Sequence, residues 1–138
     1  MKIEGGCLCG SVRYSGEAEP IFTGVCHCTN CQKSSGTAFN TVVAVPKPAV
    51  RITGTISTYE GRGDTGNATY KHFCPECGSP VAEEAAVMAD VVMIPIGTLD
   101  DPSVVNPTMQ IYCDSAQHWA LLEGGIERHA KMPGPPQA

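Results

Sequence analysis

The sequence predicts a mainly β protein, and three observations lead to this prediction. The 15 glycines and 11 prolines among 138 residues indicate many turns, and therefore short strands. Short runs of β-branched and aromatic residues recur between these turns, as in a protein built from strands. Cysteines stand in tight groups where two of these runs end, an arrangement typical of metal-binding turns.

The strands can be placed in chain order. In the first, Val12 and Tyr14 share one face, because alternate residues of a strand point the same way. The run at 39–45 is the clearest strand, and Pro46 and Pro48 end it because proline cannot extend a ladder of hydrogen bonds. The predicted strands are 11–15, 21–25, 39–45, 50–53, 56–59, 68–73, 80–84, 91–97 and 108–113.

Two connections carry specific expectations. Gly54 and Thr55 predict a tight hairpin between the strands on either side of them. Residues 32–36 predict one short helical turn that ends at a glycine.

The chain length suits one domain with a core of moderate size. We expect residues 1–130 to form this domain, with residues 116–122 packing Trp119 against its core. Residues 131–138 contain three prolines and little apolar surface, so we expect a disordered tail there.

Composition and charge exclude several classes of partner. The formal net charge is −5 and the isoelectric point is near 5.2, which argues against a nucleic-acid binder driven by electrostatics. The amino terminus lacks the apolar stretch of a signal peptide, and the longest apolar run, 85–96, is interrupted by Asp90 and Pro95. We therefore expect a cytoplasmic protein that binds neither membrane nor nucleic acid. The sequence leaves the oligomeric state open.

In a reducing compartment the 8 cysteines are better metal ligands than disulfide partners, and their close spacing also disfavours bridging. Two pairs lie far apart in the sequence and each is followed by glycine, whereas a third group places three thiols within a six-residue stretch. The simplest partition is a closed site of Cys7, Cys9, Cys74 and Cys77, and an open site of Cys26, Cys28 and Cys31. A closed site is typically structural and an open one functional, so loss of the first metal should unfold the domain.

The three-cysteine site suits thiol chemistry better than water chemistry. Three thiolates on Zn²⁺ leave a formal charge of about −1, so the metal is a weak Lewis acid and a poor generator of hydroxide. A thiol that fills the fourth position would lose its proton and remain a nucleophile toward a small electrophile. Two alternatives stay open: a second structural zinc closed by Cys113 or a histidine, and an iron–sulfur cluster that uses Cys113.

Other side chains are secondary candidates. His27 lies between two ligands and either faces solvent in a turn or takes part in proton transfer or metal binding. His72 is expected to make a structural polar contact, and Cys113 to be a small buried apolar residue. Lys33, two residues from a ligand, is the basic residue best placed to contact a substrate carboxylate; for the others a solvated surface position is expected.

The motifs GGCLCGSVRY, CHCTNCQKSSGTAF, FCPECGSPV and GTLDDP occur in this order and are followed by a late tryptophan. The chain, over about residues 3–120, resembles the glutathione-dependent formaldehyde-activating enzyme family, also called the GFA and centromere protein V family. The resemblance implies twisted antiparallel sheets of the β-tent type with a zinc knuckle. It also implies two zinc ions per chain, one structural at the four-cysteine site and one catalytic at the three-cysteine site.

The activity that the resemblance implies is a carbon–sulfur lyase reaction, the condensation of glutathione with formaldehyde to S-(hydroxymethyl)glutathione. The expected partners are thus a small thiol such as glutathione and an aldehyde. The alternative is a non-catalytic zinc module that binds thiols or a protein partner. One departure bears on the substrate: relatives often carry a histidine in the late strand where this chain has Gln110.

Overall fold

The computed structural model describes residues 1–134, and its strands form two sheets. The smaller sheet has the order β1-β2-β5 and the larger the order β11-β10-β3-β4-β9-β8-β7-β6. The strands are β1 (Lys2–Gly6), β2 (Arg13–Glu17), β3 (Phe22–Cys26), β4 (Asn40–Pro46), β5 (Val50–Thr53), β6 (Ser57–Arg62), β7 (Ala68–Phe73), β8 (Pro80–Ala85), β9 (Val91–Pro95), β10 (Met109–Ile111) and β11 (Glu127–Arg128). The predicted mainly β fold is therefore confirmed.

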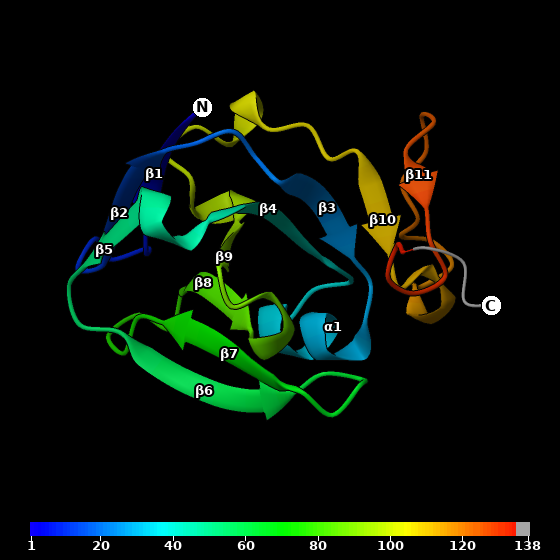
Figure 1. Ribbon diagram of the computed structural model, residues 1–138, viewed down its shortest axis with the longest axis horizontal. Coiled ribbons are helices and arrows are strands. Elements are labelled where there is room, and N and C mark those ends of the chain that lie inside the picture. Colours follow the sequence, from blue (N-terminus) through cyan, green and yellow to red (C-terminus); the bar gives the residue numbers. More distant parts are fainter. Residues whose placement is uncertain (135–138) are drawn as a thin grey trace.

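The core lies between the two sheets. In Figure 1 the smaller sheet stands at the left, and the larger sheet curves from β3 and β4 above to β6 and β7 below. Ile3 and Tyr14 of the smaller sheet belong to the same buried cluster as Val43 and Ile94 of the larger sheet. The alternation that places Val12 and Tyr14 on one face is confirmed, because both are buried.

Helical structure is short. Within residues 1–134 the one α-helix is α1 (Thr29–Ser35), which ends at Gly36 as the sequence predicts but begins earlier, inside the cysteine run. The remaining helical segments are 3₁₀ turns at Lys47–Ala49, Ala86–Met88, Ile96–Thr98, Pro102–Val104 and Cys113–Ser115. No helix in this part of the chain has the length and apolar character needed to cross a membrane.

The predicted hairpin around Gly54 and Thr55 is wrong. β5 pairs with β2 in the smaller sheet, whereas β6 pairs with β7 in the larger one, so the chain changes sheets at this point. Gly54 has a φ of 94°, and a Cβ there would lie 2.2 Å from the backbone oxygen of Ser11. The glycine is thus used for a close backbone approach rather than for a hairpin turn.

The antiparallel arrangement does not extend to one edge of the larger sheet. β10 runs parallel to both β3 and β11, while the other pairs of strands described here are antiparallel. Parallel neighbouring strands need a long connection, and here α1 and strands β4 to β9 lie between β3 and β10 in the sequence. This pairing places the late strand directly next to the three-cysteine turn.

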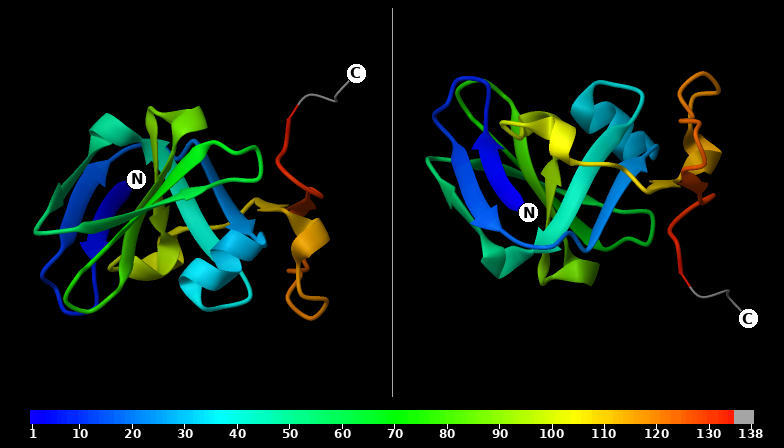
Figure 2. Two further views of the ribbon diagram at one scale, coloured as in Figure 1. Left: turned by 90° about the horizontal axis from the view of Figure 1, so that it is seen from below. Right: turned by 90° about the horizontal axis from the view of Figure 1, so that it is seen from above.

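The segment that follows β10 lies on one flank of the molecule, beyond β3 and α1, in both views of Figure 2. Trp119 in this segment is 69% exposed, so the expectation that it packs on the core is wrong. Lys131 accepts a hydrogen bond on its backbone oxygen from the Tyr112 N–H, and its ammonium pairs with Asp114. Residues 135–138 of the expected disordered tail lie outside the described residues.

Candidate metal centres

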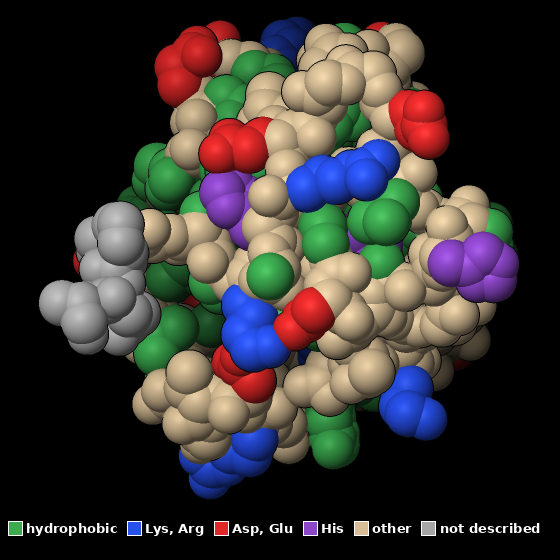
Figure 3. All heavy atoms as spheres, turned by 90° about the vertical axis from the view of Figure 1, so that its right-hand side faces the viewer, with side chains coloured by type: hydrophobic (Ala, Val, Ile, Leu, Met, Phe, Trp, Pro, Cys, Tyr) green, Lys and Arg blue, Asp and Glu red, His purple; other side chains and the backbone are tan. Residues whose placement is uncertain are grey.

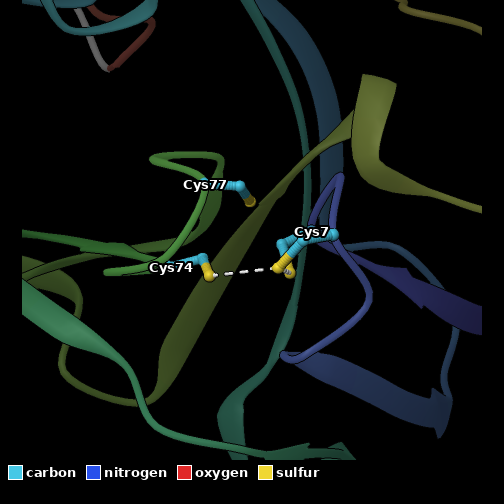
Figure 4. A group of neighbouring side chains, drawn as sticks. Cys7, Cys74 and Cys77 are labelled. Carbon is cyan, nitrogen blue, oxygen red and sulfur yellow. Dashed lines mark hydrogen bonds between the residues drawn. The ribbon is translucent and has the colours of Figure 1, made fainter.

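The four-cysteine cluster is built from two hairpin loops that belong to different sheets. Cys7 and Cys9 lie between β1 and β2, and Cys74 and Cys77 lie between β7 and β8. Figure 4 shows the side chains of Cys7, Cys74 and Cys77 directed into one shared space. A metal ion held there would fasten the smaller sheet to the larger one.

The sulfur geometry of this cluster fits a tetrahedral metal ion. All four sulfurs lie within 4.8 Å of one another. The Cys9 sulfur is 3.6 Å from that of Cys7 and 3.8 Å from that of Cys74. Zinc–sulfur bonds of about 2.3 Å place the ligand sulfurs about 3.8 Å apart, whereas a disulfide needs about 2.05 Å. All eight cysteines are free thiols, so the donor set suits zinc.

Polar groups next to the four-cysteine cluster can stabilise its thiolates. The Val12 N–H donates to the Cys7 sulfur at 3.2 Å. The Ser11 hydroxyl lies 3.1 Å from the Cys9 sulfur and 3.3 Å from the Cys74 sulfur. Such contacts orient metal ligands and favour their charged form, so Ser11 is part of the site although it is no ligand.

The second cysteine of each pair is followed by a glycine with left-handed backbone. Gly10 has a φ of 82° and Gly78 a φ of 78°, a conformation that only glycine adopts without strain. These turns bring the next N–H and hydroxyl groups back toward the sulfurs. The hydroxyl and backbone N–H of Ser79 thereby lower the pKa of Cys77 to about 5.

The three-cysteine cluster is local. Cys26 is the last residue of β3, Cys28 caps α1, and Cys31 lies in its first turn. Their sulfurs also lie within 4.8 Å of one another, and the Cys31 N–H donates to the Cys28 sulfur at 3.2 Å. Cys26 and Cys31 are buried and Cys28 is half-buried, so the cluster is accessible from the side of Cys28.

The three thiols affect one another's pKa values. Contacts with Cys26 and Cys31 lower the pKa of the Cys28 thiol, whereas contacts with Cys26 and Cys28 raise the pKa of the Cys31 thiol. A negative charge is therefore favoured on Cys28. A metal ion would displace the remaining thiol protons.

The described part of the chain adds no fourth ligand to this cluster. Among residues 1–134, no further cysteine, histidine, aspartate or glutamate brings a donor atom into the group of three. Cys113 is directed elsewhere, with its sulfur 3.6 Å from the backbone oxygen of Gln110. The described residues therefore do not provide the closed second site, or the cluster completed by Cys113, that the sequence left open.

The sequence left open whether His27 faces solvent, and the structure shows that it does not. Its side chain is completely buried, and Nε2 lies 3.0 Å from Oε1 of Gln110. The Gln110 amide also accepts from the Leu122 N–H and donates to the Leu122 carbonyl, which fixes its orientation. His27 Nε2 must therefore carry the proton and donate, while buried Nδ1 has no hydrogen-bond partner among the described residues.

A groove of about 600 Å³ runs beside the three-cysteine cluster. Asn30, which lies between two of the cysteines, and Lys33 line it from the α1 side. Strands β6, β7 and β8 form the opposite wall, with the basic side chains of Arg62 and Lys71. The three cysteines are not lining residues themselves, but the groove is lined by Asn30, between Cys28 and Cys31, and by Asn40, which pairs with Cys26.

A buried polar network connects this groove to the cluster. The Lys71 ammonium lies 3.0 Å from Oε2 of Glu83, and Oε1 of Glu83 accepts from the Asn40 amide at 2.7 Å. Asn40 stands directly opposite Cys26 in the pairing of β3 with β4. Burial lowers the pKa of Lys71, but Glu83 and the Cys31 thiol outweigh this effect, so that the pKa is raised and the ammonium stays charged.

Sequence reasoning found the cysteines and Lys33, which lines the groove, but missed Lys71, Glu83 and Asn40. The expected solvated surface position is wrong for Lys71, whose side chain is 22% exposed, because nothing in one strand reveals the carboxylate on the next. The pairing of Lys71 with Glu83 across β7 and β8 is the feature that matters. His72 makes the expected structural contacts, with Thr58 and Glu84 on neighbouring strands.

Acidic and basic side chains are interspersed on the face shown in Figure 3. No cationic patch covers this face, and this agrees with the negative net charge of the chain.

Comparison with known proteins identifies one family and one fold. Residues 2–115 match the family described as glutathione-dependent formaldehyde-activating enzyme. The chain is also similar to the crystal structure of a Rhodobacter sphaeroides protein, a structural genomics target, with a TM-score of 0.59 and 18% identity. That match covers 76% of this chain and 92% of the other, and it bears on the fold alone. A search of curated protein sequences finds no match.

Proposed function

The chain belongs to the family of glutathione-dependent formaldehyde-activating enzymes, and from this premise we propose that it condenses a small thiol such as glutathione with formaldehyde or a related aldehyde. The proposed reaction is that of a carbon–sulfur lyase. It needs a place where a thiol becomes a thiolate, and a neighbouring space that holds the rest of the thiol and the aldehyde.

One observation carries the proposal: three thiols converge without a fourth protein ligand among the described residues, at the edge of a groove. A zinc ion held by Cys26, Cys28 and Cys31 would supply an open position at which a thiol loses its proton and stays nucleophilic. The residues fit such an ion because all donors are sulfur and lie within 4.8 Å of one another.

The groove suits the remainder of glutathione. Its two carboxylates need cations, and exposed Lys33 and Arg62 line the groove from opposite walls. The volume of about 600 Å³ lies in the range of small-molecule sites. We assign Lys33 and Arg62 to binding the thiol substrate, and the four-cysteine site to holding the fold.

Calorimetry of the zinc-loaded protein tests the proposal. Glutathione should bind with release of about one proton when buffers of different ionisation enthalpy are compared, because the thiol is deprotonated on binding. S-methylglutathione keeps both carboxylates but cannot form a thiolate, so it should bind at least tenfold more weakly. Equal affinity, or no proton release, would favour the alternative of a non-catalytic zinc module.

Catalysis is tested separately by exchange NMR of formaldehyde, glutathione and their adduct. The zinc-loaded protein should accelerate adduct formation, and Cys28→Ser should remove the acceleration. If the wild-type protein binds glutathione but does not accelerate the reaction, the chain is a thiol-binding module and not an enzyme.

A further inference from the structure

Lys71 is a partly buried cation that lines the groove beside the candidate reaction site. Its side chain is 22% exposed, whereas that of Lys47, the other lysine that pairs with a glutamate on β8, is 55% exposed. Holding an ammonium in such a place costs free energy unless its charge is compensated. Glu83 supplies this compensation, with Oε2 at 3.0 Å from the Lys71 ammonium.

The ion pair with Glu83 fixes the orientation of the Lys71 side chain. Glu83 is 7% exposed, and its two oxygens are used in opposite directions, one by Lys71 and one by Asn40. Among the described residues, Glu83 is the one carboxylate within ion-pair distance of the Lys71 ammonium. An ammonium has three N–H donors, so donors remain for a ligand in the groove that Lys71 lines.

The proposed reaction creates a negative charge that needs such a donor. When the thiolate sulfur attacks the carbonyl carbon, a carbon–sulfur bond forms, the carbonyl π bond breaks, and its electron pair moves to oxygen. The thiol proton has already left to solvent, and the new alkoxide takes a proton from water to give the hydroxymethyl product. No oxidant or reductant is needed. The barrier falls if a fixed cation meets the oxygen where the charge develops.

We propose that Lys71, held in place by Glu83, binds the aldehyde oxygen and stabilises the alkoxide that forms when the thiolate adds. This inference rests on the proposed function and assigns a catalytic residue to it. Lys71 touches the substrate oxygen, and Glu83 is a positioning residue that acts through Lys71. Three thiolates make the candidate zinc ion a weak Lewis acid, so a separate cation is needed for the oxygen.

A binding experiment tests the cation without relying on activity. Glutathione sulfonate carries negative oxygens on the sulfur, close to where the alkoxide oxygen would lie, whereas S-methylglutathione carries an uncharged group there. Lys71→Met should weaken glutathione sulfonate at least tenfold and S-methylglutathione less than about twofold. Lys47→Met is the matched control, because Lys47 pairs with Glu84 at 2.6 Å outside the groove. It should change neither affinity.

Kinetics then test catalysis. Lys71→Met should lower kcat for adduct formation by about 10²–10³, the usual loss when an oxyanion donor is removed. Because this variant leaves Glu83 buried without its partner, the double variant Lys71→Met/Glu83→Gln removes both charges and protects the fold. It should show the same loss of kcat. Recovery of wild-type kcat in the double variant would overturn the proposal, because Lys71 would then only neutralise Glu83.

The outcomes separate the two proposals. If the wild-type protein is active and Lys71→Met keeps wild-type kcat and affinity for glutathione sulfonate, the role of Lys71 is wrong and the proposed function stands. If the wild-type protein neither binds glutathione nor accelerates adduct formation, the proposed function fails and the role of Lys71 fails with it.

Discussion

The two cysteine clusters differ in what they connect. The four-cysteine cluster joins loops of different sheets, and its Cys9 and Cys74 are 65 residues apart in the chain. The three-cysteine cluster links the end of β3 to the first turn of α1, all within 26–31. Closing a long loop costs conformational entropy that a metal can offset only in the folded state. We therefore expect metal binding at the first cluster to be coupled to folding far more than at the second.

The clusters also differ in how their negative charge is compensated. Around the four-cysteine cluster, backbone N–H groups and the hydroxyls of Ser11 and Ser79 approach the sulfurs. Beside the three-cysteine cluster stands a charged lysine, Lys71, with its carboxylate. Hydrogen bonds from the protein compensate the thiolates without offering a group to a ligand. A cation that lines a groove can also contact a ligand bound there. We therefore propose a structural role for the first cluster and a chemical role for the second.

The strongest way to break this comparison is to remove one ligand from each cluster. Cys77→Ser should leave the domain unfolded, because structural zinc contributes roughly 10–16 kcal/mol to small cysteine sites, as much as the whole stability of a domain. Cys28→Ser should leave a folded domain that lacks one metal. Circular dichroism and metal analysis measure both results. Equal loss of structure in the two variants would refute the division of roles.

Metal removal tests the same division in the unaltered chain. A chelator of moderate affinity should take up metal in two phases, the first equivalent coming from the three-cysteine cluster with no change in circular dichroism. The second equivalent should leave together with the fold, because it holds the two sheets together. A single phase, or a total of one metal per chain, would contradict the partition of seven cysteines into four and three.

Ser11 sharpens the comparison, because its hydroxyl contacts thiols of the four-cysteine cluster alone. Ser11→Ala should lower metal affinity at that cluster by about 10- to 100-fold, a loss typical of groups that support metal ligands. The three-cysteine cluster should keep its affinity. Ser103→Ala is the control, since the Ser103 hydroxyl bonds to Asp101 and not to a thiol. Competition with a chelator of known affinity measures both clusters.

At the three-cysteine cluster, Gln110 supports the cysteine turn through its hydrogen bond with His27. Gln110→Ala leaves the His27 Nε2–H and the Leu122 N–H without a partner, so unfolding by urea should show a loss of about 1–3 kcal/mol. The Leu122 carbonyl keeps its hydrogen bond from Arg128. Gln117→Ala removes one exposed hydrogen bond, to Gln32, and should change stability by less than about 0.5 kcal/mol. Equal effects would mean that the buried network does not support the turn.

The smallest expected effect concerns the Arg13–Asp100 pair, an exposed counterpart of Lys71–Glu83. Arg13 donates to both Asp100 oxygens, at 2.9 and 2.5 Å, and this lowers the pKa of Asp100. A carboxyl with a lowered folded pKa stabilises the fold above its unfolded pKa of about 3.9 and loses this contribution as pH falls through the folded pKa. The small difference in unfolding midpoint between wild type and Asp100→Asn should therefore be present at neutral pH and vanish in acid.

The sequence alone predicted the approximate positions of the described strands except β1 and β11, and the division of seven cysteines into groups of four and three. Both are local properties: strands follow from short runs of β-branched residues, and the C-x-C and C-x-x-C spacings place thiols on one turn whatever surrounds them. The glycine after each pair of the four-cysteine cluster was visible as well, and Gly10 and Gly78 take the left-handed backbone that such turns need.

Only the tertiary structure decided which strands pair and which side chains share a site. The connection at Gly54 and Thr55 has the composition of a hairpin, yet Gly54 lies against the backbone of Ser11 and the next strand joins the other sheet. His27 became a buried donor because β10 returns parallel to β3 and brings Gln110 beside it. Lys71 became a partly buried cation because β8 presents Glu83 to it. Each depends on residues far apart in sequence, and no local pattern encodes their contact.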